Sequence, residues 1–505
     1  MNKLKHIIFI FMAVVALSMT GCSDDFLETG PTNAISEDVV SESLENLYLA
    51  VNGIQRKLIS QDGSSQGMGG EPGFGMARDT QSDDLEFNTK TNGWHRDLQR
   101  WTAQGNIKSS YIRIPWQVYY MRILNANQIL KSVDKFQQTG GDLYKQVKAE
   151  ALTFRAHSHF MLVQCYGKRY VAGQTNDNLG VPYRTTPVNE PMARNTVKEV
   201  YDQVNKDLDE AIQLIDGISL KVDEPNHFNY ASICGLKARV ALAIQNYAEA
   251  ADYADKAIAF SEKKGVKLFT PEQIESCPTT SLFADISTAG EMIWGAMTKD
   301  DQTIYFYSFY AYMSWNFNSS AIRQAVKCIN SNLYDTMSET DTRRCWWDPT
   351  GNAQTPKSSF VKRKYQNRKF TARHTSNAVG DYAFMRLAEL YLMKAEALAR
   401  AEKYAEAQEI FTRFQVTRDP AYVAKGNTGD ALIAEIMNSR WVELWGEGFN
   451  WLDHKRLGLP VDRSNSNFDE TACLVLEVNA DDNRWQWAIP EQERNCNPLL
   501  EQNPL

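Results

Sequence analysis

Two stretches of the chain decide its fold: LKARVALAIQNYAEA at 236–250 and MKAEALARAEKYAEA at 393–407. They align over fifteen residues without a gap, and six positions are identical. Each stretch is followed by a second segment whose apolar residues recur at helical spacing, over 253–258 in the first copy and 410–414 in the second. The sequence therefore predicts two similar helical hairpins.

The hairpins have the features of the tetratricopeptide pattern, which is a helix, a short turn and a second helix with small residues where the pair crosses. The copies start 157 residues apart, so they do not form a simple tandem array. Residues 265–380 are rich in Trp, Tyr, Asn, Pro and Gly, which indicates an insertion with little regular structure. We predict a mainly α fold, with tetratricopeptide-like helix pairs in a right-handed superhelical scaffold and long loop-rich insertions.

Further helices are predicted before the first repeat. Apolar spacing indicates helices over residues 43–59, 114–133 and 144–167. Another helix begins at Thr196, where Thr196 and Glu199 have the spacing of a capping box, in which each side chain accepts the other residue's backbone N–H. Residues 60–110 are rich in Gly, Ser, Asp and Asn, and we predict a long loop region there.

Composition narrows the class of protein. The 505 residues are 43% hydrophobic, which is enough to bury a large core and argues against a disordered chain. The 54 Lys and Arg residues are outnumbered by 62 Asp and Glu, for a net charge of −8. This balance disfavours a nucleic-acid binder, because binding phosphates requires clustered cations.

The N-terminus predicts a secretory signal peptide. Lys3 and Lys5 precede an unbroken apolar run over 7–17, which is shorter than the roughly 20 residues that a membrane-spanning helix needs. The ending at 18–22 resembles a bacterial lipobox, in which Cys22 is acylated and becomes the mature N-terminus. Cleavage there leaves a net charge of −10. Several acyl chains on one cysteine anchor a protein stably in a membrane.

The seven other cysteines indicate buried thiols. Their number is odd and no C-x-x-C spacing occurs, which argues against a metal ribbon or a fully paired disulfide framework. Cys328 and Cys345 are the one pair that we consider for a bridge.

Several segments, in chain order and over nearly the whole length, resemble the SusD/RagB family of Bacteroidetes nutrient-uptake lipoproteins. They are residues 149–167, 180–183, 194–208, 386–397, 440–458 and 487–504. The segment from Arg440 is similar to the family signature E-R-x-x-E-L-x-x-E-G-x-R-x-x-D-L-x-R, although Asn450 stands for the usual Arg and His454 for the usual Leu. We interpret this motif as structural.

The resemblance implies an α-rich body with tetratricopeptide-like helix pairs. It also implies a lid on a TonB-dependent transporter, a SusC-like barrel, that helps bind glycans or other nutrients for import. Residues 23–25 resemble the acidic export tag of Bacteroidetes surface lipoproteins, which implies a lipid anchor in the outer membrane and an outward-facing protein. We divide the chain into a signal peptide at 1–21, an N-terminal region at 22–220 and a C-terminal region at 221–505, packed as one body.

Carbohydrate recognition without catalysis needs flat aromatic faces and a few planar polar groups. The densest candidate is 305–317, where eight of thirteen residues are aromatic. Within it we select Tyr310 and Trp315, the latter as an exposed platform, and we add Asn318 as a polar partner. The alternative is that these rings fill the core beneath the insertion.

A second candidate lies in the early loops, and the resemblance implies that the glycan site draws on this region and on the insertion. Here we select Arg78, Asp83, Asn92 and Trp94 as ligand-binding residues. The pair at 346–347 is a third candidate, with core packing as its alternative.

Catalytic readings have less support. The motifs H-E-x-x-H, G-x-S-x-G and G-x-x-x-x-G-K-[ST] are absent from the sequence. Glu443 and Glu447 lie one helical turn apart beside Arg440, which favours an ion-pair cluster over the two carboxylates of a glycosidase. We predict a glycan-capturing lipoprotein with no enzymatic activity, cofactor or metal. Capture of a peptide or other nutrient, a surface glycan hydrolase and a pure interaction scaffold remain alternatives.

Overall fold

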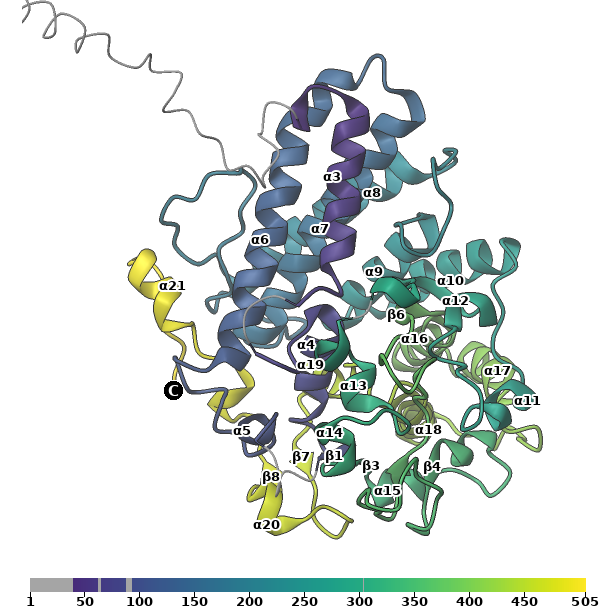
Figure 1. The fold of residues 1–505 in the computed structure, drawn as a ribbon. Coiled ribbons are helices and arrows are strands. Elements are labelled where there is room, and N and C mark those ends of the chain that lie inside the picture. The colour runs from purple at the N-terminus through teal and green to yellow at the C-terminus, as the bar shows by residue number, and fades with distance from the viewer. Residues whose placement is uncertain (1–39, 62–64, 88–92, 303) are drawn as a thin grey trace, which may run out of the picture.

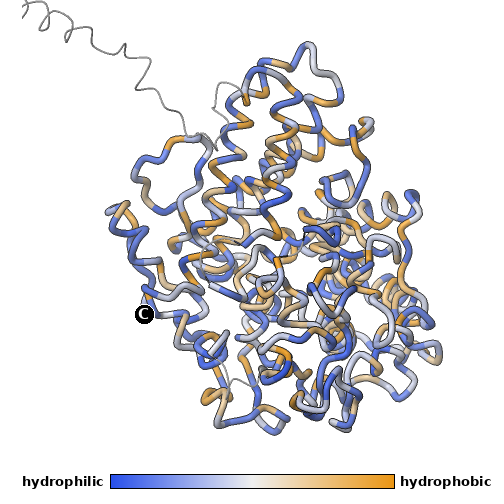
Figure 2. The backbone as a smooth tube through the Cα atoms, in the orientation of Figure 1, coloured by the Kyte–Doolittle hydropathy of each residue, from blue (hydrophilic) through white to orange (hydrophobic). Residues whose placement is uncertain are grey.

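The computed structural model describes residues 40–61, 65–87, 93–302 and 304–505. The predicted signal peptide, Cys22 and Asn92 lie outside the described residues. Four long helices form an N-terminal bundle (Figure 1): α3 (Leu44–Lys57), α6 (Ser110–Val133), α7 (Gly141–Tyr166) and α8 (Val197–Ile215). Hydrophilic and hydrophobic positions are interspersed along these helices (Figure 2). Helix α8 buries one face, whereas α7 is buried on all sides from Ala149 to Tyr166.

The predicted capping box opens α8. Thr196 Oγ1 accepts the Glu199 N–H at 3.1 Å, and the Glu199 carboxylate accepts the Thr196 N–H at 2.9 Å. The backbone N–H of Glu199 is thus satisfied before the helical ladder begins, so α8 starts where the sequence predicts.

The two repeats fold as hairpins that lie side by side. The first consists of α9 (Tyr230–Ala243) and α10 (Tyr247–Lys263), and the second of α16 (Leu387–Arg400) and α17 (Tyr404–Gln415). Helix α10 packs against α16, and α18 (Gly429–Glu443) packs against α16 and α17. The mainly α, tetratricopeptide-like prediction is therefore confirmed, with the hairpins adjacent in space although they are far apart in sequence.

The residues that the repeats share explain this packing. Lys237 on α9 pairs with Asp209 on α8 at 2.7 Å, and the equivalent Lys394 on α16 pairs with Asp255 on α10 at 2.6 Å. Each repeat lysine thus joins its hairpin to the preceding helix. Four of the shared alanines are fully buried, which lets the helices approach closely: Ala238, Ala250, Ala395 and Ala407.

The insertion and the early loops contain short strands that their sequences do not reveal. Strands β1 (Leu85–Phe87), β3 (Lys327–Ile329), β5 (Gln366–Asn367) and β4 (Trp347–Asp348) form an antiparallel sheet in that order. Strands of two or three residues are too short to show a period of two. A second antiparallel pair joins β2 (Met292–Ala296) to β6 (Tyr382–Arg386), and β6 leads directly into α16.

The prediction of a long loop region over 60–110 is wrong at α4 (Gly70–Asp79), whose ten residues are all buried. Three glycines and a proline conceal this helix in the sequence, because both residue types lower helix propensity. Gly75 explains why glycine is present: a Cβ there would lie 3.3 Å from the Cα of Gly448. Close packing therefore overrides local propensity.

The remaining described elements are short. The helices are α5 (Arg96–Gln99), α11 (Pro271–Ser276), α12 (Ile286–Ala289), α13 (Tyr310–Met313), α14 (Ser320–Arg323), α15 (Ser331–Tyr334), α19 (Asn450–Leu457), α20 (Glu470–Cys473) and α21 (Glu491–Cys496). The 3-10 helices are η2 (Asp134–Phe136), η3 (Asp300–Gln302), η4 (Tyr305–Tyr307), η5 (Thr342–Trp346) and η6 (Asn483–Trp485), and β7 (Val461–Asp462) pairs with β8 (Glu477–Val478).

Among the described residues, all seven cysteines are free thiols, including Cys328 and Cys345, so these two form no bridge. No helix in the described part of the chain is long and apolar enough to cross a membrane.

Candidate functional site

The aromatic run at 305–317 divides into an exposed end and a buried end. Tyr305 and Phe306 in η4 are 54% and 49% exposed, whereas Phe309, Tyr310 and Tyr312 are buried. Of all aromatic side chains that the structure describes, only Tyr305 and Phe306 are exposed. The sequence prediction selected this aromatic segment but did not select these two exposed rings.

Tyr310 requires a correction as a ligand-binding residue. Its side chain is 3% exposed, its ring stands against Gly380, and its hydroxyl donates to the Asp381 carbonyl at 2.9 Å. Burial raises the pKa of Tyr310 well above its usual value. Tyr310 is part of the core beneath the exposed rings, as the alternative interpretation of this segment proposed.

The early loops pack onto the same segment. Trp94 is half-buried and meets Tyr312 edge-on, with ring centroids 5.7 Å apart. His95 also meets Tyr312 edge-on at 5.8 Å. At Gly69, a Cβ would lie 2.4 Å from the Tyr307 carbonyl oxygen, so this close approach needs glycine. Trp94 and the insertion thus meet on one face.

His95 is a buried, neutral support of this face. Its Nε2 lies 3.3 Å from the Gly67 carbonyl oxygen, which ties two parts of the early loops together. Burial, together with the positive charge of Lys327, lowers the pKa of His95 to about 3. The ring therefore stays uncharged at neutral pH and packs as an aromatic group.

Trp315 is less open than predicted. The side chain is half-buried, and its Nε1 donates to Thr371 Oγ1 at 2.8 Å. The guanidinium of Arg368 covers one ring face, with Cζ 3.8 Å from the ring centroid. Asn318 is exposed, as a polar partner must be, and accepts a hydrogen bond from Arg323 at 3.0 Å.

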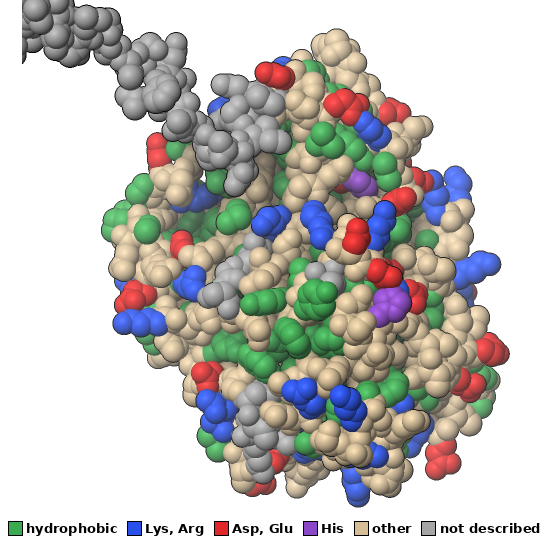
Figure 3. Space-filling model, viewed as in Figure 1, with side chains coloured by type: hydrophobic (Ala, Val, Ile, Leu, Met, Phe, Trp, Pro, Cys, Tyr) green, Lys and Arg blue, Asp and Glu red, His purple; other side chains and the backbone are tan. Residues whose placement is uncertain are grey.

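We call Trp94, Tyr305, Phe306 and Trp315 the ring surface. Phe306 packs on the buried Phe317 with centroids 6.0 Å apart, which supports the exposed ring from beneath. Figure 3 shows hydrophobic side chains gathered in the middle of the face where Figure 1 places α4 and α13. Flat rings on an open face can stack on the C–H surface of a sugar.

Arg78 and Asp83 lie away from the ring surface, which corrects their prediction as ligand contacts. Arg78 is 6% exposed, and its Nε donates to the Gly448 carbonyl at 3.4 Å. Asp83 Oδ2 lies 3.2 Å from His454 Nε2. Both residues join the early loops to the signature segment.

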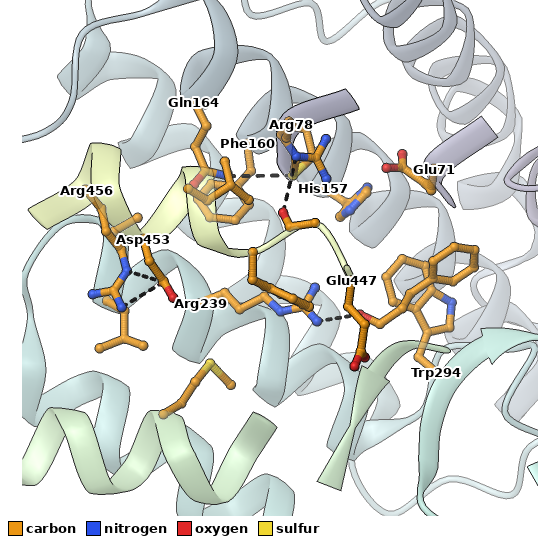
Figure 4. A pocket seen from close by; sticks show the side chains of 18 of the residues that line it. Glu71, Arg78, His157, Phe160, Gln164, Arg239, Trp294, Glu447, Asp453 and Arg456 are labelled. Carbon is orange, nitrogen blue, oxygen red and sulfur yellow. Dashed lines mark hydrogen bonds and ion pairs between the residues drawn. The ribbon is translucent and has the colours of Figure 1, made fainter. Parts of the chain in front are cut away.

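A cavity of about 70 Å³ lies beside Arg78, where α4 and α7 meet the loop that contains Glu447 and Gly448 (Figure 4). Arg78 and His157 point into it from one side and Arg239 from another. Ligand pockets typically measure about 300–1,000 Å³, so this cavity suits a few water molecules rather than a sugar.

The predicted ion-pair cluster around Glu443 is confirmed, but its partners differ. Glu443 pairs with Arg386 and Arg418, each at 3.0 Å, and Glu447 pairs with Arg386 at 2.8 Å. Arg440 instead pairs with Asp453. Burial opposes ionisation, yet Arg418 and Arg386 hold the pKa of Glu443 far below its usual value. A permanently ionised carboxylate enclosed by arginines stabilises the fold and is unsuited to acid catalysis.

The pair Trp346 and Trp347 is buried, so the core interpretation holds for this third candidate. Two open grooves measure about 670 Å³ along α17 and α18 and about 460 Å³ along α6 and α21. Neither is lined by an exposed aromatic ring among the described residues. In the same part of the chain, no group of three or more His, Cys, Asp or Glu side chains is placed to hold a metal ion.

The fold is that of a helical repeat protein with insertions. Its hairpins lie side by side, and the insertion between them carries the exposed aromatic rings. Within that class, the chain belongs to the SusD family, whose sequence profile matches residues 203–505. A second profile, described as "Starch-binding associating with outer membrane", matches residues 66–242. The family resemblance of the sequence is thus confirmed.

Solved structures share the fold over nearly the whole chain. A SusD-like carbohydrate binding protein from Bacteroides vulgatus has a TM-score of 0.76 at 22% identity, covering 91% of this chain and 97% of that one. A SusD superfamily protein from Bacteroides thetaiotaomicron has a TM-score of 0.76 at 21% identity, covering 92% and 100%. Surface glycan-binding protein A from Bacteroides fluxus has a TM-score of 0.69 at 18% identity, covering 92% and 99%. No curated protein matches this sequence.

Proposed function

We propose that this chain is an outer-membrane lipoprotein that captures oligosaccharide on the ring surface and acts as a lid on a TonB-dependent transporter. One observation carries the proposal: the only exposed aromatic rings among the described residues, Tyr305 and Phe306, are neighbours in η4, and the same aromatic segment contacts Trp94 through Tyr312. Membership of the SusD family and the sugar-binding titles of structural neighbours support the ligand class.

The rest of the architecture supports capture rather than turnover. A glycosidase places two carboxylates across the scissile bond, whereas the signature carboxylates Glu443 and Glu447 are held by arginines in the core. Lipid attachment at Cys22 and association with a SusC-like barrel rest on the lipobox and on family membership.

The regions 22–220 and 221–505 are proposed to work as one body. Contacts across that division support this: the Trp487 N–H donates to the Cys165 carbonyl at 2.9 Å, and Asp83 contacts His454. The two matching profiles overlap at 203–242, which includes the proposed division.

The test is calorimetric titration of the protein with a panel of oligosaccharides. Each exposed ring is worth about 0.5–1.5 kcal/mol in stacking, so the double change Tyr305→Ala and Phe306→Ala should weaken binding by about 5- to 160-fold. Trp94→Ala should weaken it as well. Leu499→Ala, at a side chain that is 52% exposed near α21, is the matched control and should leave affinity unchanged.

Other results would support the alternatives. Unchanged affinity in the ring variants would place the ligand elsewhere, and reducing ends that accumulate during incubation would indicate a hydrolase. Binding of peptides in place of sugars would identify a different nutrient. Co-purification of a barrel by a protein that binds no ligand would favour an interaction scaffold.

A further inference from the structure

One part of the insertion is strongly basic in an otherwise acidic protein. From 349 to 380 the sequence contains seven Lys and Arg residues and not a single Asp or Glu, although the whole chain has a net charge of −8. Across 320–373 there are eleven basic and four acidic residues. Such a segregation of charge creates a local positive potential, which attracts anions.

Three of the seven cations are neutralised within the protein. Arg363 pairs with Glu86, Lys369 with Glu447, and Arg373 with Asp285 and Asp381. The other four form no ion pair with any residue that the structure describes, and neither does the nearby Arg323. We call these five the basic border: Arg323, Lys357, Lys362, Lys364 and Arg368.

The basic border is open to solvent. Lys357, Lys362 and Lys364 are exposed, and Arg323 and Arg368 are half-buried. Arg368 donates from Nη1 to the Gln354 carbonyl at 2.6 Å, which uses one of its five N–H groups within the protein. These charges are therefore in position to meet a ligand from solution.

The basic border adjoins the ring surface directly. Arg368 lies on Trp315, as described above. Arg323 donates a hydrogen bond to Asn318, which follows Trp315 by three residues. The Arg323 carbonyl accepts the Val361 N–H at 3.0 Å, which holds the run 361–364 beside α14. In Figure 3, Lys and Arg side chains lie at the edge of the hydrophobic patch, where Figure 1 places α14.

Within the described protein Asp348 attracts Arg368, but none of the five cations forms an ion pair, which leaves electrostatic repulsion between them. A ligand that supplies negative charge offsets it, and guanidinium groups match the geometry of carboxylate and sulfate oxygens. A guanidinium stacked on Trp315 is also fixed in orientation, so less side-chain entropy is lost when it binds.

We propose that the ligand is an acidic oligosaccharide, whose sugar rings stack on the ring surface while its carboxylate or sulfate groups bind the basic border. This inference rests on the proposed glycan-binding function and specifies its substrate class. A saccharide is favoured over a nucleic acid or a lipid surface, because stacking platforms stand beside the cations while the protein as a whole is acidic.

The experiment measures binding of the full lipoprotein, in uncharged detergent, to three matched ligands. These are a uronic-acid oligosaccharide, its carboxyl-reduced neutral counterpart, and a sulfated oligosaccharide of similar length. We expect an acidic ligand to bind at least about tenfold more tightly than the neutral one at about 50 mM salt, with a smaller difference at about 500 mM because salt screens exposed charges. The preferred acid distinguishes a carboxylate from a sulfate ligand.

Two double variants test the contributions of the basic border and of the ring surface separately. Lys362→Gln with Lys364→Gln should weaken the acidic ligand about fivefold or more, as expected for the loss of two charge contacts, and leave the neutral one unchanged. The matched control is Lys145→Gln with Lys206→Gln, at two exposed lysines on α7 and α8. Tyr305→Ala with Phe306→Ala should weaken both ligands.

The outcomes distinguish the two proposals. Equal affinity for the acidic and neutral ligands overturns the acidic-ligand inference and leaves the glycan-binding function standing. No binding to any saccharide overturns the glycan-binding function itself. If anionic vesicles or a single-stranded oligonucleotide bind with the same sensitivity to Lys362→Gln and Lys364→Gln while saccharides do not, the basic border serves another partner and the inference is wrong.

Discussion

His454 stands where the family signature has leucine, so His454→Leu removes one ion pair and restores the usual residue. His454 Nε2 faces Asp83 Oδ2 at 3.2 Å, and its Nδ1 faces the Asn450 carbonyl oxygen at 3.0 Å. Both ring nitrogens thus meet acceptors, which favours the doubly protonated imidazolium. Burial disfavours that charge, but the Asp83 carboxylate outweighs burial and raises the pKa of His454 to about 9.

The raised pKa of His454 determines how much its ion pair contributes to stability and in which direction that contribution changes with pH. Relative to an unfolded value of about 6.5, a folded value of about 9 contributes about 3 kcal/mol to stability below pH 6.5. The contribution is lost as pH rises through the folded pKa, so about 2 to 3 kcal/mol disappears between pH 7 and pH 10. This is an upper value, because the Asp83 side chain is 20% exposed and solvent screens part of the attraction.

The assay is urea unfolding of the wild type, His454→Leu, Asp83→Asn and the double variant at several pH values between 7 and 10. Other groups titrate in that range, so the quantity of interest is the coupling energy of the double-mutant cycle. We expect about 2 kcal/mol of coupling at pH 7 and close to none at pH 10. A coupling energy that stays constant over this range would refute the charged pair.

Three further predictions concern the fold. Thr196→Ala removes the N-cap of α8 and should lower the free energy of unfolding by about 1 kcal/mol, measured by urea unfolding. Gly448→Ala should destabilise the protein by more than about 2 kcal/mol, because φ is +91° and a Cβ would meet the Gly75 Cα at 2.6 Å. Gly53→Ala in α3 is the opposite case: a Cβ there meets nothing within 4 Å, so the change should stabilise the protein by up to about 1 kcal/mol. Glu443→Gln removes one negative charge from the buried cluster, in which Arg386 and Arg418 keep Glu291 as a partner, and so leaves one buried positive charge uncompensated. It should cost about 3–5 kcal/mol in the same measurement, while a loss under about 1 kcal/mol would contradict the network.

The helices could be predicted because their signals are local. The capping box at Thr196 and the repeat stretches contain within a few residues the caps, spacings and small side chains that form the structure. Helix α4 could not be predicted in this way, because one of its glycines, Gly75, is explained by the backbone at Gly448, far away in the sequence. Helix propensity describes a segment in isolation, whereas packing against the rest of the protein determines whether the helix forms.

The sequence suggests segments for the candidate site, but it does not show which single rings are exposed. The density of aromatic residues indicated 305–317, but Tyr310 and Phe306 differ only in what packs against them, which depends on Gly380 and Asp381. Arg78 shows the same limit, because its partner at Gly448 comes from another region of the chain. From sequence alone, a charged residue in a polar loop cannot be told from a ligand contact, because its partner within the protein lies far away in the sequence.

The core ion network also connects to the ring surface. Glu447 pairs with Arg386 and, at 2.7 Å, with Lys369, and the carbonyl of the next residue, Phe370, accepts the Trp315 N–H at 3.0 Å. The signature carboxylate thus helps fix the segment 369–370, to which the backbone of Trp315 is hydrogen-bonded. Changes at Glu447 should therefore alter stability and ligand binding together, whereas changes at exposed rings such as Phe306 should alter binding alone. Because buried ion pairs hold the scaffold in this way, the exposed ring positions can be substituted without loss of the fold.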